Sequence, residues 1–314
     1  MLSSNIYIVG WRGYIGQSLL SYLSRTGFKK QVFLYSRNNE ANDLTPDFID
    51  AMLCQHEDFV SKIVHDINPV VYYLANYLSP AESQSHAFES VNSNLLPFIR
   101  FIEDIKLVAS NVTFIFASSG GTIYGDMGGE KCREDHILSP KTIYAANKLA
   151  QESYLQVYRC NYGLNYRVLR IANPYGPGQV FKGGQGLIPA IMDSYTNKAP
   201  VKIYGDGSAS RDYIYIDDLH DCFIKSASYQ GDIRIFNVGS NSKYSILDII
   251  ESFNRHGIIF DTVKVKSDIS VVNSISLDIT RAKREFNWSP QTSFDNGLKK
   301  YIEWYKLTSQ QIKL

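Results

Sequence analysis

The chain has 314 residues, a length that exceeds a typical single domain and suits a doubly wound sheet with a smaller appended lobe. Its 32 Lys and Arg against 31 Asp and Glu give a formal net charge of +1, which provides no bulk attraction to nucleic acid or to a membrane surface. The cysteines at positions 54, 132, 160 and 222 have no CxxC or His/Cys spacing, so we predict reduced thiols and no metal site.

Short apolar runs alternate with helical patterns through the first half of the chain. No signal-peptide pattern precedes the first run and no stretch of about 18 apolar residues occurs, so we expect a cytoplasmic protein that does not enter the membrane. The alternation predicts an α/β fold with a doubly wound parallel sheet, which binds ligands at the carboxyl ends of its strands. The expected strands are residues 5–9, 31–35, 70–75, 112–117 and 166–171, and the expected helices are residues 14–25 and 144–162.

A glycine-rich loop follows the first expected strand and opens the first expected helix. Gly10, Gly13 and Gly16 have the spacing GxxGxxG, which allows the backbone to approach a pyrophosphate at the helix N-terminus. The spacing alone is weak, and a plain strand–helix turn is the alternative, but its position after an apolar strand favours dinucleotide binding. The loop residues expected to bind the cofactor are Gly10, Arg12, Gly13, Tyr14, Ile15 and Gly16.

The end of the second expected strand bears on which dinucleotide binds. An NAD site usually has an acidic residue there for the ribose 2′-hydroxyl, whereas this chain has Tyr35-Ser36-Arg37-Asn38. A guanidinium binds a 2′-phosphate through charge-assisted hydrogen bonds, and Arg12 in the glycine loop can reach the same group. The two arginines favour NADP(H) and leave NAD possible; the alternative is that both are solvated surface charges.

Two hydroxyl-bearing segments and a lysine are candidates for catalysis. Tyr144 and Lys148 lie four residues apart on one helix face, where an ammonium, together with a cationic nicotinamide, favours the phenolate of a group whose free pKa is about 10. Such a phenol can exchange a proton with a substrate hydroxyl, although an ordinary amphipathic helix is the alternative. The expected strand at 112–117 is followed by Ser118-Ser119, where a hydroxyl can bind the reacting oxygen; a glycine-rich turn capped by serines is the alternative.

The pattern changes beyond Asn173. Turn residues dominate the segments 173–178, 183–186 and 205–208, in contrast to the regular alternation before them. We predict that this part is a loop-rich lobe that closes over a ligand.

Taken together, these motifs resemble the extended short-chain dehydrogenase/reductase family of nucleotide-sugar epimerases, dehydratases and reductases. The resemblance implies a Rossmann domain over residues 1–172, to which a segment at about 212–238 returns, and a mainly substrate-binding lobe over residues 173–314. It covers nearly the whole chain and is carried by residues 10–16, 74–76, 91–92, 118–125, 144–148, 169–178, 211–218 and 278–290.

The resemblance also implies roles for individual residues. Tyr144 is the expected acid/base, and Lys148 is expected to bind the nicotinamide ribose. Leu74, Ala75 and Asn92 match further cofactor-binding positions. Asn173 and Arg211 match positions that hold the diphosphate of the substrate; an ion pair with Asp212 or Asp218 is the alternative for Arg211. The family resemblance further implies a homodimer through helices at about 91–106 and 144–162.

Several departures from the family pattern restrict the reaction. Gly120-Gly121 occupies the place of the Asp-Glu pair of the dehydratases, which argues against dehydration. Counted from the strand, Ser119 takes the catalytic hydroxyl position, whereas counted from Tyr124-Gly125, Gly120 does; we favour Ser119 and keep Thr122 in reserve. No cysteine follows the serines, so epimerisation beside a ketone is not expected. Asn273-Ser274 stands where many relatives have a phosphate-binding arginine.

These features favour one reaction over two alternatives. The favoured reaction is reduction by NADPH of the C4 ketone of a nucleotide-diphospho-4-keto-6-deoxyhexose, such as the dTDP-linked sugar, for surface polysaccharides such as lipopolysaccharide O-antigen. The second is 4-epimerisation of a UDP-hexose with tightly bound NAD, which uses the same residues. The third is a non-catalytic dinucleotide sensor, which has no need of Tyr144 and Lys148. Only the arginines at the cofactor site separate the first from the second.

Overall fold

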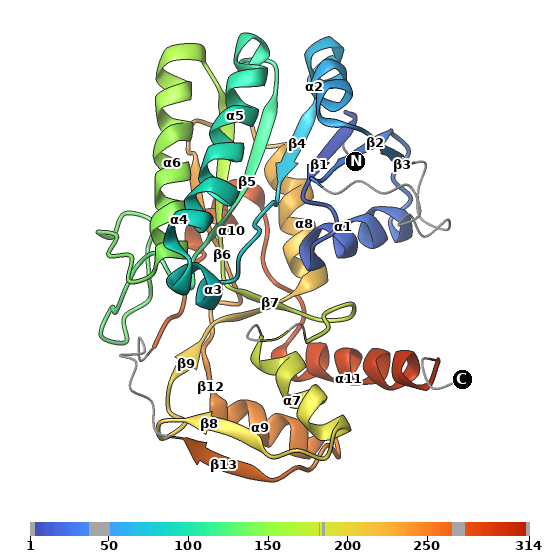
Figure 1. The fold of residues 1–314 in the computed structure, drawn as a ribbon, viewed down its shortest axis with the longest axis vertical. Coiled ribbons are helices and arrows are strands. Elements are labelled where there is room, and N and C mark those ends of the chain that lie inside the picture. Colours follow the sequence, from blue (N-terminus) through green and yellow to red (C-terminus); the bar gives the residue numbers. More distant parts are fainter. Residues whose placement is uncertain (1–3, 38–50, 182, 184–185, 266–273, 312–314) are drawn as a thin grey trace.

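The computed structural model describes residues 4–37, 51–181, 183, 186–265 and 274–311. A seven-stranded sheet forms the upper part of the molecule in Figure 1, and a lobe of short strands and helices lies below it. No helix within the described ranges is both long and apolar enough to cross a membrane. None of the four cysteines, which all fall within these ranges, forms a disulfide.

All neighbouring strands of the large sheet are parallel, and their order is β11-β6-β5-β4-β1-β2-β3. The order reverses between β1 and β4, and in such sheets the crevice at this switch point binds the ligand. The strands are β1 (Ile6–Val9), β2 (Val32–Tyr35), β3 (Ala51–Leu53), β4 (Val70–Tyr73), β5 (Thr113–Ser119), β6 (Asn165–Ile171) and β11 (Ile235–Val238).

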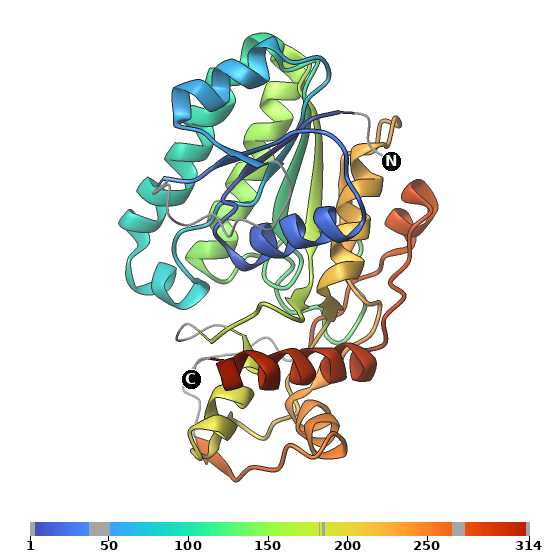
Figure 2. The same ribbon diagram turned by 90° about the vertical axis from the view of Figure 1, so that its right-hand side faces the viewer.

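Helices cover both faces of this sheet, as Figure 2 shows. Alternate residues of β1 therefore enter two different cores: Ile6 and Ile8 pack on one side, and Tyr7 and Val9 on the other. The helices of the first side are α1 (Tyr14–Arg25), α8 (Ile216–Ala227) and α10 (Thr280–Phe286). Those of the second side are α2 (His56–His65), α5 (Leu96–Ile105) and α6 (Ile143–Tyr162), with the short segments α3 (Pro80–Ser85), α4 (Ala87–Ser90), η2 (Val91–Leu95) and η3 (Lys106–Val108) nearby.

The lower lobe contains three two-stranded sheets and three helices within the described residues. The strand pairs are β7 (Asn173–Tyr175) with β10 (Tyr213–Tyr215), β9 (Ser210–Arg211) with β12 (Tyr244–Ser245), and β8 (Val201–Tyr204) with β13 (Thr262–Val265). The helices are α7 (Leu187–Thr196), α9 (Ile246–Arg255) and α11 (Phe294–Gln311).

The sequence predicts the large sheet better than the lobe. Each predicted strand is present within one or two residues of its expected bounds, and both predicted helices are present. The predicted loop-rich lobe also contains the helices α7, α9 and α11. Its strands are only two to four residues long and lie between glycine turns. Strands this short leave too few residues for an alternating pattern to stand out.

Candidate functional site

The glycine loop lies between β1 and α1, at the switch point of the sheet. Gly10 has φ of +87°, and a Cβ there would lie 2.6 Å from Cα of Ala75 at the end of β4, so only glycine fits. A Cβ on Gly16 would lie 2.5 Å from Cα of Trp11, so this glycine lets the helix pack against the loop. The loop thus brings the predicted cofactor residues Gly10 and Ala75 into contact.

The first turn of α1 is open to an anion. Gly13 is its N-cap and offers no side-chain hydrogen bond, and the turn contains no acidic residue. Uncapped amide groups and the helix dipole favour a phosphate at such an end. The Tyr14 hydroxyl turns away from it and donates to the carbonyl O of Gly176 at 3.1 Å, which ties the helix to the turn after β7.

Arg37 follows β2 and is exposed, as the sequence argument requires. Its guanidinium carbon lies 4.5 Å from the ring centroid of Tyr77, a residue that follows β4. A guanidinium stacked on an aromatic ring retains its donors at its edge, where they can bind a phosphate. Arg12 is half-buried in the glycine loop, and Asn38 lies outside the described residues.

The hydroxyl groups converge where β5 ends. Thr122 Oγ1 donates to Ser119 Oγ at 2.9 Å, and a side-chain hydrogen bond joins Ser119 to Tyr144 in the first turn of α6. A Cβ at position 120 would lie 2.5 Å from Cδ1 of the buried Leu277, so this position faces the interior. Of the two alignments of the loop, this geometry favours Ser119 over Gly120.

The surroundings of the Tyr144 phenol disfavour its charged form. Burial raises the pKa of Tyr144, and the hydrogen bond with Ser119 lowers it by less. The ammonium of Lys148 does not offset this effect, because its Nζ lies 5.9 Å from the ring centroid and donates elsewhere. The predicted lowering of the pKa combines this ammonium with a cationic nicotinamide, and it stays a prediction for the protein with cofactor bound.

Lys148 lies one helical turn further along α6 and is almost fully buried, with 3% of its surface exposed. Its Nζ donates to the carbonyl O of Ala117 at 2.9 Å and lies 4.8 Å from the ring centroid of Phe116. Burial lowers the pKa of Lys148 to about 8, and the carboxylate of Glu152 counters part of this shift. The ammonium is thereby anchored to the same strand end as Ser119.

The two predicted diphosphate-binding residues lie on the lobe side of this strand end. Asn173 begins β7, and its amide nitrogen Nδ2 donates to the carbonyl O of Asp212 at 3.1 Å. A Cβ on Gly121 would lie 3.8 Å from Asn173 Oδ1, which places Asn173 beside the serine-bearing loop. Asn173 therefore lies near the predicted hydroxyl residues.

Arg211 makes neither of the ion pairs that the alternative interpretation requires. Its NH1 donates to the carbonyl O of Ser210 at 2.8 Å, and no carboxylate forms an ion pair with it among the described residues. Asp212 instead accepts from Ser240 N at 2.8 Å, and Asp218 accepts from Thr292 N at 2.9 Å. A half-buried guanidinium without a carboxylate remains available for a phosphate.

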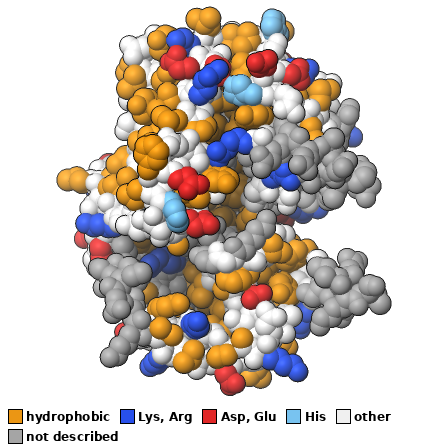
Figure 3. Space-filling model, viewed as in Figure 1, with side chains coloured by type: hydrophobic (Ala, Val, Ile, Leu, Met, Phe, Trp, Pro, Cys, Tyr) orange, Lys and Arg blue, Asp and Glu red, His pale blue; other side chains and the backbone are white. Residues whose placement is uncertain are grey.

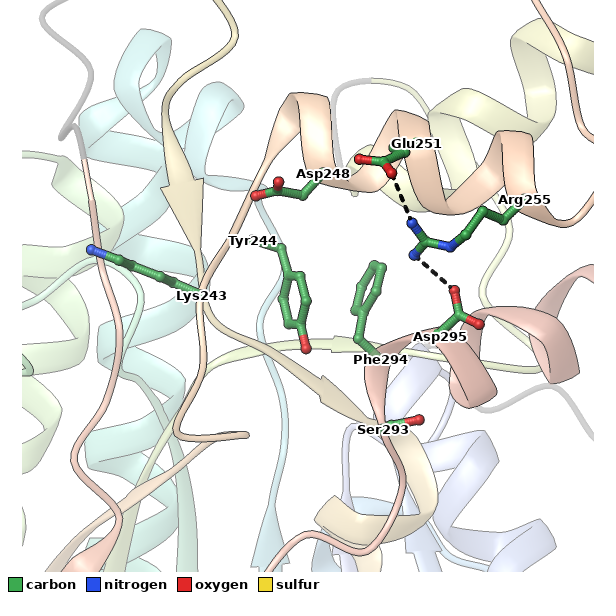
Figure 4. A pocket seen from close by; sticks show the side chains of 8 residues that line it. All are labelled: Lys243, Tyr244, Asp248, Glu251, Arg255, Ser293, Phe294 and Asp295. Atoms are coloured by element: carbon green, nitrogen blue, oxygen red, sulfur yellow. Dashed lines mark hydrogen bonds and ion pairs between the residues drawn. The ribbon is translucent and has the colours of Figure 1, made fainter.

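A pocket of about 430 Å³ lies in the lobe but is separate from this cluster (Figure 4). Tyr244 and Phe294 stack in it with ring centroids 4.3 Å apart. Arg255 forms ion pairs with Glu251 at 3.3 Å and with Asp295 at 3.0 Å, so its charge is already paired within the pocket. None of the predicted site residues lines this pocket, and it contains none of the acid/base pairs described above.

Comparisons with known proteins agree with this architecture. The model of the NAD dependent epimerase/dehydratase family matches residues 6–239. A dTDP-4-dehydro-6-deoxyglucose reductase from Escherichia coli is 30% identical, over 96% of this chain and 97% of its own length. A UDP-glucose 4-epimerase from Mycolicibacterium smegmatis is 27% identical, over 96% and 99%. The solved UDP-glucose 4-epimerase of Thermotoga maritima with UDP-glucose has a TM-score of 0.86 at 28% identity, over 97% of this chain and 99% of that one.

The chain belongs to the NAD dependent epimerase/dehydratase family. This confirms the family and the α/β fold with a parallel sheet that the sequence predicts. The likeness extends to reductases and epimerases alike, so membership alone does not fix the reaction.

The residues present fit the dinucleotide of this family. The contact of Gly10 with Ala75 leaves no room for a side chain, and the uncapped start of α1 lies next to it. One predicted cofactor residue fits less clearly: Asn92 is exposed on η2, whereas Asn94 on the same segment is buried and accepts from the backbone N of Tyr77 at 2.6 Å.

Three residues near the site escape the motif analysis. Tyr77 supports Arg37, and Glu152 and Arg170 form a buried ion pair of 2.8 Å beside Lys148. Glu152 follows Lys148 by four residues, so helical spacing places it on the face of Tyr144. A charged residue on a helix face that is expected to be buried is unusual, and this signal in the sequence could have pointed to Glu152.

The hydrogen bond between Ser119 and Tyr144 yields a measurable prediction. Ser119→Ala removes a bond that stabilises the phenolate, so the pKa of Tyr144 should rise further. The titration can be followed by NMR of ¹³Cζ-labelled tyrosine, with the signal assigned through its loss in Tyr144→Phe. Ser153→Ala, on the exposed side of α6, is the control and should leave the midpoint in place. An unchanged or lower midpoint in Ser119→Ala would show that the two side chains do not interact.

Proposed function

We propose that the protein reduces the C4 ketone of a nucleotide-diphospho-4-keto-6-deoxyhexose, such as the dTDP-linked sugar, with NADPH. The observation that carries this proposal is the phenol of Tyr144, hydrogen-bonded to Ser119 at the ligand-binding edge of the sheet. Ketone reduction consumes one hydride and one proton, and a tyrosine that retains its proton is the form which can supply the latter. The name of the Escherichia coli relative supports the same reaction.

Each side chain of the site has a separate role in this reaction. Ser119 donates a hydrogen bond to the C4 oxygen, for which Thr122 holds its hydroxyl in place. Tyr144 protonates the same oxygen as the C=O bond becomes a C–O bond. Asn173 and Arg211 orient the diphosphate, and the space in front of Gly121 admits the sugar. The dinucleotide, when bound, supplies the hydride.

Residues 1–172, with the edge strand β11, are proposed to hold that dinucleotide. The glycine loop and the start of α1 bind its pyrophosphate, and Leu74 and Ala75 line the crevice beside it. Lys148 binds the nicotinamide ribose through its ammonium. Arg37, supported by Tyr77 and joined by Arg12, binds the 2′-phosphate of NADP(H). The lobe of residues 173–314 then completes the sugar site.

A second candidate is 4-epimerisation of a UDP-hexose with tightly bound NAD. The structural likeness to the Thermotoga maritima epimerase favours it. Epimerisation needs Tyr144 to take a proton as well as to give one, and the same side chains can serve both steps. A non-catalytic sensor gains no support from the placement of Tyr144 beside Ser119, since sensing does not need an acid/base group.

The decisive experiment offers the purified protein NADPH with the dTDP-linked 4-keto-6-deoxyhexose. Oxidation of NADPH, followed by its absorbance, should match the alcohol formed one for one. Tyr144→Phe removes the proton donor and should lower kcat by a factor of about 10²–10⁴, the usual contribution of a general acid. Lack of NADPH oxidation, together with interconversion of UDP-hexoses without added cofactor, would replace the reductase by the epimerase.

The cofactor preference can be tested at Arg37. Arg37→Ala removes a charge-assisted hydrogen bond to the 2′-phosphate, which NADH lacks, so the KM for NADPH should rise about tenfold or more while that for NADH stays near its original value. Tyr77→Leu should also raise the KM for NADPH, but by a smaller factor, because it removes only the ring that supports the guanidinium. The KM for NADH should again stay near its original value. Arg284→Ala, an exposed arginine on α10, is the control. Equal rises for both cofactors would remove Arg37 from the 2′-phosphate site.

We also propose a homodimer, formed through the helices predicted for that role. Hydrophobic side chains gather over this side of the molecule in Figure 3, and exposed ones include Leu96 on α5 with Tyr154 and Val157 on α6. Exposed apolar patches of this kind mark protein interfaces. Light scattering should therefore give twice the chain mass of 35.6 kDa, and Leu96→Glu with Val157→Glu should halve it. A monomer in the unaltered protein would contradict the proposal.

A further inference from the structure

A carboxylate lies beneath the proposed catalytic pair on the same helix. Tyr144, Lys148 and Glu152 follow one another at intervals of four residues on α6 and share one face. Glu152 is 6% exposed, and Arg170 on the neighbouring strand β6 is 2% exposed. Burying two charges of this kind requires compensation from close partners.

Those partners come from two strands of the sheet. Glu152 Oε1 accepts from Ser118 Oγ on β5 at 2.5 Å, and Oε2 accepts from Arg170 NH2 on β6 at 2.8 Å. Arg170 Nε adds bonds of 3.3 Å to both carboxylate oxygens. Ser118 directly follows Ala117, whose carbonyl O binds Lys148 Nζ. The carboxylate therefore fixes the strand end that anchors the ammonium.

The network continues away from the site and holds Arg170 in place. Arg170 NH1 donates to the Tyr124 hydroxyl at 3.0 Å, which in turn donates to Asn237 Oδ1 on β11 at 2.6 Å. Asn237 N donates to Glu134 Oε1 at 2.8 Å. Glu152 is thus held directly from β5 and β6, and indirectly from β11 through Arg170 and Tyr124. A carboxylate so constrained cannot swing away from Lys148.

Lys148 depends on this negative charge because its other neighbours provide none. Tyr144 on its own helix carries a phenol whose pKa is raised by burial. On β5, Lys148 meets only a carbonyl oxygen and the Phe116 ring. Arg170 on β6 is positive, but its Nε and NH2 donate to Glu152. Burial lowers the pKa of Lys148 to about 8, and Glu152 is the group that raises it.

We propose that Glu152 is a positioning residue which keeps Lys148 charged and fixed at the end of β5. This inference rests on the proposed function for its catalytic consequence, because Lys148 binds the nicotinamide ribose only as an ammonium. The claim that Glu152 keeps Lys148 charged depends only on the geometry of the protein and not on the reaction. The competing interpretation is that Glu152 and Arg170 form a structural ion pair with no effect on Lys148.

The test is the titration of Lys148 in the protein without cofactor. NMR of ¹³Cε-labelled lysine follows it, with the signal assigned through its loss in Lys148→Met. In Glu152→Gln the midpoint should fall by about one pH unit or more, since an opposite charge is lost and Arg170 is left unopposed. Glu134→Gln is the matched control: it neutralises another buried carboxylate of the same network and should leave the midpoint in place. An unchanged midpoint in Glu152→Gln overturns the proposal.

A second variant covers the case in which Glu152→Gln does not fold. Glu152→Gln combined with Arg170→Gln removes both charges and leaves neither member of the pair as an unpaired ion, which is the milder change. It should lower the Lys148 midpoint in the same direction, whereas the structural interpretation predicts an unchanged midpoint together with a lower melting temperature.

Activity separates this inference from the proposed function. In whichever reaction the unaltered protein catalyses, the basic limb of its kcat profile should move to lower pH in Glu152→Gln, because Lys148 loses its proton earlier. If the unaltered protein acts on none of the sugars, the proposed function fails while the titration still decides the role of Glu152. If the protein is active and neither the titration nor the profile moves, only the role of Glu152 fails.

Discussion

The site depends on one contact, the hydrogen bond of a buried ammonium to the end of a central strand. Lys148 Nζ reaches the carbonyl O of Ala117 at 2.9 Å, and this contact fixes α6 against β5. Tyr144 and Ser119 then face each other, because one lies a helical turn before Lys148 and the other two residues after Ala117. Since a buried ammonium is costly without such partners, the arrangement tolerates little displacement.

The parallel sheet places these groups beside the cofactor loop without any direct contact between them. β1 and β5 both flank β4, so the turn after β1 and the hydroxyl groups after β5 end on the same edge. The close approach of Gly10 to Ala75 at the end of β4 fills the space between them. The lobe lies against the same edge, and the face shown in Figure 3 is hollowed between the two parts. The strand order thus brings the proposed proton donor, the glycine loop and the proposed sugar site to one edge of the sheet.

Local sequence patterns predict those parts of the site that depend on neighbours along the chain. The glycine loop and the Tyr144–Lys148 spacing are of this kind, and the helix predicted at 144–162 is α6, Ile143–Tyr162. Contacts between distant segments leave no such pattern. The stacking of Arg37 on Tyr77 and the pair of Glu152 with Arg170 could not be predicted for this reason. The sequence does not display burial, which raises the pKa of Tyr144 in the protein without cofactor; the lowering by a bound, cationic nicotinamide stays a prediction.

The most direct test of this account is a crystal structure of the protein with NADPH bound. It should show Lys148 Nζ within about 3 Å of the hydroxyls of the nicotinamide ribose, with the pyrophosphate on the first turn of α1. The Tyr144 hydroxyl should face the nicotinamide. A nicotinamide bound away from the end of β5, or Lys148 still directed only at Ala117, would contradict the central claim.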